Sequence, residues 1–259
     1  GAPPDSAFGE RLLAAFHELG PHGLVWRHGP RQIEAVHAIR NLVHADLRDR
    51  TGETDGVVRR LHTAGALDDT ALVNVIVMVE MGRYDLHGLF RWLARYAGLH
   101  PSAATRVANE DDAEPAVGNS PSRAFVLETL RLDQSERLLR RAEQNLVFDG
   151  YLIPRGAMVR LCLWESHKDD HHFPQPFDFQ PERFRDSDLP PDQFSPFGLD
   201  EHYCPLAEPS LLLGTTFLRA LCRQYSVTPI NDGPPVRGAY HWEPAPAFTV
   251  RLSLRSSDP

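Results

Sequence analysis

The spacing of apolar residues changes along the chain, and this change predicts two kinds of secondary structure. In the first part, apolar residues recur every three or four positions, the period of one face of an α-helix. Near residue 146 the period falls to two, which is typical of short strands. Helices are predicted over Phe8–Leu19, Arg31–Arg48, Val57–His62, Thr70–Gly98 and Pro121–Arg140, with a last helix over Pro205–Tyr225.

The long helix predicted from Thr70 has an unusual first half. Residues 71–79 read Ala-Leu-Val-Asn-Val-Ile-Val-Met-Val, which is apolar nearly all round. A helix of this kind is expected to be buried on every side. Pro101 is predicted to end the helix, and the acidic segment 109–119 is predicted to connect it to the next element.

Strands are predicted in the second half of the chain. The period of two covers Leu146–Phe148, Gly150–Ile153 and Met158–Leu163, and β-structure is also expected over Pro229–Leu254. The segment Pro174–Pro196 is rich in proline and is predicted to be extended. The fold class is therefore mainly α with small β-sheets near the C-terminus.

Composition excludes several classes of protein. The formal net charge of −8 over 259 residues argues against nucleic acid or an anionic membrane as the main partner, because both require a basic face. No apolar run reaches the roughly 20 residues that a membrane-spanning helix needs. The first residues lack the charged and apolar stretches of a secretion leader, so a cytoplasmic location is expected.

The cysteines and histidines give few further sites. Three cysteines without pair spacing argue against a disulfide framework and a zinc site, and Cys162 and Cys222 are predicted to be buried apolar side chains. His171 and His172 are predicted to lie on the surface, and a metal site there is disfavoured because no carboxylate or cysteine was recognised at ligand spacing.

Five local patterns follow one another over residues 128–211. Glu128-Thr-Leu-Arg131 places two opposite charges on one helical face. The others are Arg140-x-Ala142 with the Gly150–Gly156 segment, His167-Lys-Asp169 with Phe173-Pro-Gln-Pro176, Pro181-Glu-Arg183-Phe184, and Phe194-Ser-Pro-Phe197-Gly198 followed by Cys204. In this order and rough spacing they resemble the cytochrome P450 family.

The resemblance implies a haem site with named residues. Cys204, in the loop that begins at Phe197, would be the thiolate ligand of haem b, a ligand that donates charge to iron and favours O–O cleavage. Arg140 and His202 would contact the haem propionates, although a surface ion pair and a plain loop histidine are the alternatives. Phe197 would also belong to the cofactor-binding residues. Glu128, Arg131 and Arg183 would form a structural triad.

The cysteine loop departs from the family pattern at three positions. Asp200 and Leu206 stand where the family has glycine, and His202 stands where it has arginine. Replacing glycine at a tight turn restricts the backbone, which puts haem binding in question.

The long helix resembles the central helix of the family, with a different pair of polar residues. Tyr84 and Asp85 replace the usual acid and threonine. Asp85 could act as an acid or base and Tyr84 as a hydrogen-bond donor, and peroxide use, rearrangement or dehydration would then be plausible. The alternative is that both lie on a solvated helix face.

The resemblance covers nearly all of the chain but lacks the N-terminal part of the family fold. A single domain over residues 1–259 is expected, with a mainly helical part over 1–120 and the motif-bearing part over 121–259. A homodimer or a partner chain is expected to replace the missing region.

Three hypotheses about function remain open. The first is a haem-thiolate oxidoreductase acting on a small or carrier-bound secondary metabolite, with a possible redox partner. The second is a non-catalytic partner that activates another biosynthetic enzyme, such as a glycosyltransferase. The third is that the chain is one piece of a longer protein.

Overall fold

A computed structural model of the chain describes residues 6–19, 29–49, 56–111, 120–134, 137–185, 189–238 and 241–255. Close contacts between Cα atoms divide the chain into two compact units, Gly1–Asp85 and Leu86–Pro259. The boundary lies within the long helix α4 (Asp69–Leu99), whose continuity the apolar pattern had predicted. The single domain expected over residues 1–259 stays a prediction.

The first unit is helical. It contains α1 (Ala7–Leu19), α2 (Pro30–Asp49), α3 (Val57–Thr63) and the first part of α4. Its core is formed by one apolar stripe from each of three helices, including Phe16 and Leu19 of α1, Ile39 of α2, and Leu72 and Ile76 of α4. The buried positions on these three helices therefore confirm the helical period that the sequence predicted.

The first half of α4 is less buried than its sequence predicted. Leu72 and Ile76 are buried, but Met78 and Val79 are 39% and 46% exposed. The prediction of burial on all sides is wrong at these positions, because the first-unit core covers only one stripe of the helix.

The second unit surrounds a larger core. Its helices are the second part of α4, α5 (Pro101–Ala108), α6 (Pro121–Thr129), α7 (Leu163–Ser166) and α8 (Ala207–Gln224), with short 3₁₀ turns η2 (Pro181–Phe184) and η3 (Asp200–His202). A Cβ atom on Gly214 of α8 would lie 3.3 Å from Leu89 of α4 and 3.4 Å from Val126 of α6. The absence of a side chain at Gly214 thus lets three helices approach closely.

Two predictions about the helices of this unit have different outcomes. α4 ends just before Pro101 as predicted, and Pro101 also begins α5, since proline fits the first turn of a helix. The helix predicted over Pro121–Arg140 is α-helical only to Thr129. It continues as one π-helical turn, η1 (Leu130–Gln134), and gives way to strand β1 (Arg137–Arg141).

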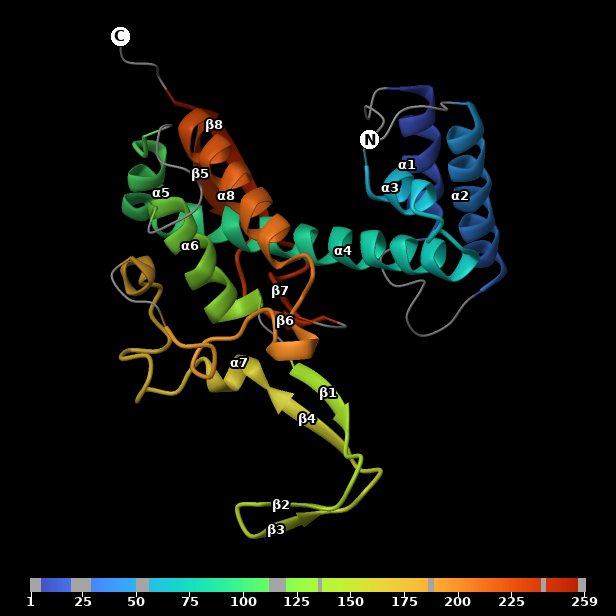
Figure 1. Ribbon diagram of the computed structural model, residues 1–259. Helices are drawn as coiled ribbons and strands as arrows, with labels where there is room; N and C mark the ends of the chain where they lie inside the picture. Colours follow the sequence, from blue (N-terminus) through green and yellow to red (C-terminus); the bar gives the residue numbers. More distant parts are fainter. Residues whose placement is uncertain are drawn as a thin grey trace. The chain divides into compact units, whose positions relative to one another are not determined.

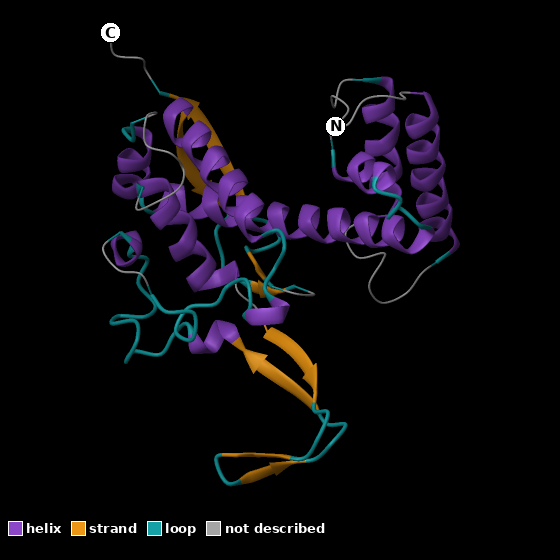
Figure 2. Ribbon diagram, in the orientation of Figure 1, coloured by secondary structure: helices purple, strands orange, loops and turns teal. Residues whose placement is uncertain are grey.

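Four antiparallel strand pairs occur among the described residues; the period of two had predicted the strands over residues 146–163, whereas β1 had been predicted as helix. β1 pairs with β4 (Met158–Cys162), and β2 (Leu146–Phe148) pairs with β3 (Tyr151–Ile153). β5 (Tyr225–Ile230) pairs with β8 (Thr249–Leu254), and β6 (Val236–Arg237) pairs with β7 (Trp242–Glu243). The fold class, mainly α with small β-sheets, is confirmed (Figure 2).

The β2–β3 hairpin projects beyond the β1–β4 pair, away from α5, α6 and α8 (Figure 1). Asp149 and Gly150 form its two-residue turn with φ of 50° and 79°. Its apolar side chains are strongly exposed: Val147 at 73%, Phe148 at 74%, Tyr151 at 75% and Leu152 at 64%. Within the second unit, this hairpin is an uncovered apolar surface.

Three smaller predictions have mixed outcomes. Cys222 is buried as predicted, whereas Cys162 is exposed because it ends strand β4, which is open to solvent. In the predicted connecting segment, residues 112–119 lie outside the described residues. Across the described helices, none combines the length and apolar character needed to cross a membrane.

Candidate functional site

A buried charge pair lies at the end of α6. Glu128 and Arg131 have fully buried side chains and share two hydrogen bonds, of 2.7 Å from Nε and 2.8 Å from Nη2 of the guanidinium. The helical spacing places both groups on one face, as the sequence predicted. A bidentate pair of this kind is a charge-assisted interaction with fixed geometry.

The remaining donors of Arg131 bind backbone carbonyl groups. Nη1 donates to the carbonyls of His167 at 2.9 Å and Pro176 at 2.7 Å, and Nη2 donates to that of Asp178 at 3.2 Å. The guanidinium also lies over the Phe173 ring. Arg131 therefore ties the segment 167–178 to the helix end.

Arg183 completes the predicted triad. Its Nε lies 3.5 Å from Oε1 of Glu128, and its Nη2 donates to the carbonyl of Gln175 at 2.9 Å. The structure thus brings Glu128, Arg131 and Arg183 together. Their assignment as a structural, non-catalytic group remains a prediction.

A buried histidine and a half-buried lysine beside the triad were not predicted as site residues from the sequence. His167 is 1% exposed, and Lys168 donates to the carbonyls of Arg131 at 2.9 Å and Leu132 at 2.5 Å. Burial lowers the pKa of Lys168 to about 7, outweighing the opposite effect of the Asp133 carboxylate. The His167-Lys-Asp169 pattern contains this lysine but does not predict its contacts, since its partners lie 36 and 37 positions away.

Asp133 belongs to the same buried region. The Tyr96 hydroxyl donates to its carboxylate, and burial raises the pKa of both groups. These contacts join α4 to η1 within the second unit.

The cysteine loop runs from Phe197 to the start of α8. The amide of Cys204 donates to the carbonyl of Phe197 at 2.8 Å, which closes the loop. Gly198 has a φ of 78°, and a Cβ atom there would lie 2.9 Å from the carbonyl oxygen of His202. Cys204 is half-buried. The loop therefore presents a thiol on a tightly folded backbone, which fits a metal-binding thiolate.

Two of the three departures from the family pattern have visible geometric effects. Asp200 has a φ of 49°, the left-handed region in which glycine is favoured. Leu206 is the N-cap residue of α8, with φ of −101° and no side-chain capping bond. Pro205 and Pro209 carry no N–H, so the start of α8 offers few amides to an anionic sulfur.

The propionate candidates are not joined to the cysteine by described contacts. Nη1 of Arg140, on β1, donates to the carbonyl of Leu139, and His202 lies exposed in η3. Phe197 contacts the Tyr203 ring edge-on. The described loop thus fits haem at the cysteine, while the roles of Arg140 and His202 remain predictions.

Tyr84 and Asp85 are the last residues of the first unit. Tyr84 is half-buried and Asp85 is exposed on α4. The cysteine loop belongs to the second unit, so a role for the two residues toward Cys204 stays a prediction.

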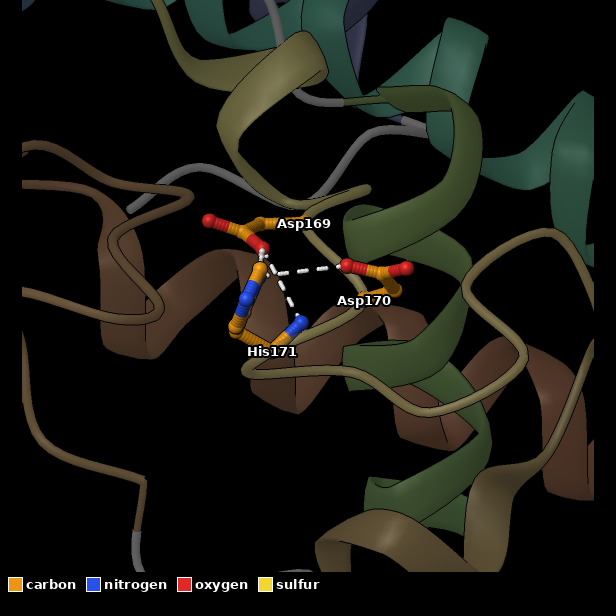
Figure 3. A group of neighbouring side chains, drawn as sticks. All are labelled: Asp169, Asp170 and His171. Atoms are coloured by element: carbon orange, nitrogen blue, oxygen red, sulfur yellow. Dashed lines mark hydrogen bonds and ion pairs between the residues drawn. The ribbon is translucent and has the colours of Figure 1, made fainter.

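An exposed acidic cluster follows His167 and Lys168. Nδ1 of His171 lies 3.0 Å from Asp169 and 3.2 Å from Asp170, as Figure 3 shows. The prediction that no carboxylate lies at ligand spacing from these histidines is therefore wrong, since Asp169, Asp170 and His171 could reach one ion. Hydrogen bonding to Asp169 raises the pKa of His171, which favours a protonated imidazole over a metal ligand.

Comparison with known proteins gives one consistent family. The model of the cytochrome P450 family matches residues 122–236. Ent-kaurenoic acid oxidase 2 of Arabidopsis thaliana is 26% identical over 94% of this chain, and cucurbitadienol 11-hydroxylase of Siraitia grosvenorii is 36% identical over 42%.

The chain is shorter than these proteins. It spans 50% of the length of the first relative and 24% of that of the second. Among solved structures, a retinoic acid-bound cyanobacterial CYP120A1 is similar with a TM-score of 0.77 and 20% identity, over 98% of this chain and 64% of that one. This last likeness concerns the fold alone.

Proposed function

Because the chain belongs to the cytochrome P450 family, we propose that it forms the cysteine-bearing part of a haem b oxidoreductase, with Cys204 as the thiolate ligand of iron. The observation that carries the proposal is the closed loop between Phe197 and Cys204, which leads directly into α8. The cofactor would supply oxidative chemistry, and the chain would supply the ligand and its rigid support.

The proposed activity is oxidation of a small or carrier-bound secondary metabolite. The relatives that support it carry names such as oxidase, hydroxylase and monooxygenase. An electron-donating redox partner and a cytoplasmic location are parts of the same proposal.

The second part of the proposal concerns the roles of Tyr84 and Asp85. We propose that Asp85 exchanges protons and that Tyr84 donates a hydrogen bond, in place of an acid and threonine pair. Proton delivery would then differ from that of an ordinary hydroxylase, which favours peroxide use, rearrangement or dehydration. Comparing Asp85→Asn with His87→Gln, an exposed neighbour on α4, tests this role. Equal turnover with peroxide in both variants would contradict it.

The first test is the absorption spectrum of the reduced protein with carbon monoxide. We expect the red-shifted Soret band of thiolate-ligated haem, lost in Cys204→Ala and kept in Cys162→Ser, which changes an exposed cysteine outside the loop. Absence of haem from protein produced with ample haem would contradict the enzyme proposal.

Absence of haem would favour the alternative, in which the chain is a non-catalytic partner of another biosynthetic enzyme. The specific observation behind this alternative is the left-handed backbone of Asp200, where a side chain restricts the loop.

The proposal also includes a second copy of the chain or a partner chain. The support is the β2–β3 hairpin, on which four apolar residues pair across the two strands and are largely exposed. Contiguous exposed apolar surface of this kind marks interaction sites. Phe148→Ser should shift the mass in analytical ultracentrifugation from dimer to monomer. Leu254→Ser, an equally exposed apolar site on β8, should not. A monomeric parent protein would exclude the homodimer.

A further inference from the structure

His167 lies between the buried triad and the cysteine loop. It follows α7 directly and is 1% exposed. Its Nε2 lies 3.2 Å from the backbone amide of Ser195, and its ring packs 5.0 Å from that of Phe194. The side chain therefore contacts the segment that leads into the loop.

The hydrogen bond fixes the chemical form of the ring. A nitrogen that accepts an N–H carries no proton, so the neutral imidazole bears its proton on Nδ1. Burial, with the nearby charges of Lys168 and Arg131, lowers the pKa of His167 to about 3. The accepting form thus persists through the neutral range.

A short series of backbone bonds leads from Ser195 to Cys204. The carbonyl of Ser195 accepts the amide of Gly198 at 3.1 Å, and the carbonyl of Phe197 accepts that of Cys204 at 2.8 Å. The backbone of His202 lies so close to Gly198 that even an added Cβ atom would be only 2.9 Å from its carbonyl oxygen, so the loop has little room to adjust. A displacement at Ser195 would be transmitted to the cysteine.

The backbone of His167 is bonded to the triad. Its carbonyl accepts Nη1 of Arg131, whose guanidinium is paired with Glu128. Since both bonds belong to one residue, His167 joins the most buried charges of this region to the loop.

We propose that His167 is a positioning residue for the cysteine loop, acting as a neutral acceptor that holds the amide of Ser195. The inference rests on the proposed function in taking Cys204 as the iron ligand. The test of the proposal for His167 needs no haem. A negative result for His167 is therefore distinguishable from a failure of the chain to bind haem.

The test compares two variants in a Cys162→Ser background. His167→Gln keeps an acceptor near the Nε2 position, and His167→Leu removes it. The rate at which Cys204 reacts with a colorimetric disulfide reagent reports the state of the loop. Cys222 is buried, and burial raises the pKa of its thiol to about 11, so it does not compete.

We expect His167→Leu to raise the reaction rate of Cys204 by about tenfold, the effect of losing one buried hydrogen bond. His167→Gln should react within about twofold of the parent, as should His172→Leu, which changes an exposed histidine of the same turn. Hydrogen exchange of the Ser195 amide should increase in the Leu variant only.

Nitrogen NMR of the parent should show the neutral Nδ1–H tautomer. Unchanged exchange at Ser195 in His167→Leu would overturn the proposal. So would failure of His167→Gln to fold, because ring packing and not the accepted hydrogen bond would then be what His167 supplies.

Discussion

The buried triad and the cysteine loop hold their geometry by different means. Arg131 is fixed through its side chain, with bonds to Glu128 and to three backbone carbonyls. The cysteine loop is closed by backbone bonds, and its residues 200–203 are all exposed. A geometry set by one buried side chain is lost with that residue, whereas a loop closed by backbone bonds keeps those bonds when its exposed side chains change.

Among the changes that test this comparison, a substitution in the triad is expected to cause the largest loss of stability. Arg131→Leu leaves the Glu128 carboxylate buried without its partner, and we expect a loss of about 3–5 kcal/mol in the free energy of unfolding. Urea unfolding measures it. Arg160→Leu removes a partly exposed pair with Glu165 and should cost less than about 1 kcal/mol. Equal losses of stability in Arg131→Leu and Arg160→Leu would contradict the expected difference between the buried pair and the partly exposed pair.

The next effect concerns acid stability. The pKa of His167 is about 3 in the folded chain against an ordinary value of 6.5, so the unfolded chain binds more protons between these pH values. Stability should therefore rise with pH from 3 to 6.5, by up to about 1.4 kcal/mol per pH unit from this group. Urea unfolding of the parent and of His167→Gln at several pH values isolates this contribution, as the difference between their free energies of unfolding. A constant difference would be inconsistent with a buried neutral ring.

A smaller effect of the same sign is expected from Lys168, which is partly exposed. The pKa of Lys168 is about 7 in the folded chain, below the ordinary value of 10.5. As the pH rises, the folded chain therefore loses this proton before the unfolded chain does. Stability should rise as pH increases from 7 to 10.5. Lys168→Met should flatten this rise, measured by thermal unfolding across that range. Lack of any change in slope would refute the lowered pKa.

The smallest effect sharpens the comparison within the loop. Asp200→Gly removes a side chain from a left-handed position and should stabilise the chain by about 0.5–1 kcal/mol. Glu201→Gly, in the same 3₁₀ turn without a positive φ, should destabilise it by a similar amount. Thermal unfolding compares the two. A loss in both variants would mean that Asp200 is not strained.

The elements that follow a simple period were predictable from the sequence. The apolar stripes of α1, α2 and α8 and the alternation in β2 to β4 predicted each of these elements within a few residues. The spacing of Glu128 and Arg131 likewise predicted their pairing, because three residues on a helix bring two side chains together.

The remaining features depend on contacts between distant segments. Strand β1 reads Arg-Leu-Leu-Arg-Arg, which favours a helix locally and becomes a strand through pairing with β4. The burial of His167 depends on Phe173 and Phe194, and the second of these lies far along the chain. Neither feature leaves a periodic signal.

The two-residue turn at Asp149 and Gly150 has a consequence for the order of folding. A hairpin closed by neighbouring residues needs no distant partner and forms on a timescale of about 1–10 μs. Helix α8 must instead wait for segments more than a hundred positions away, such as Leu89 of α4, to reach Gly214. The nascent chain therefore displays an apolar, strand-edged surface before its main core exists, which makes the hairpin the segment where a chaperone is most needed during synthesis.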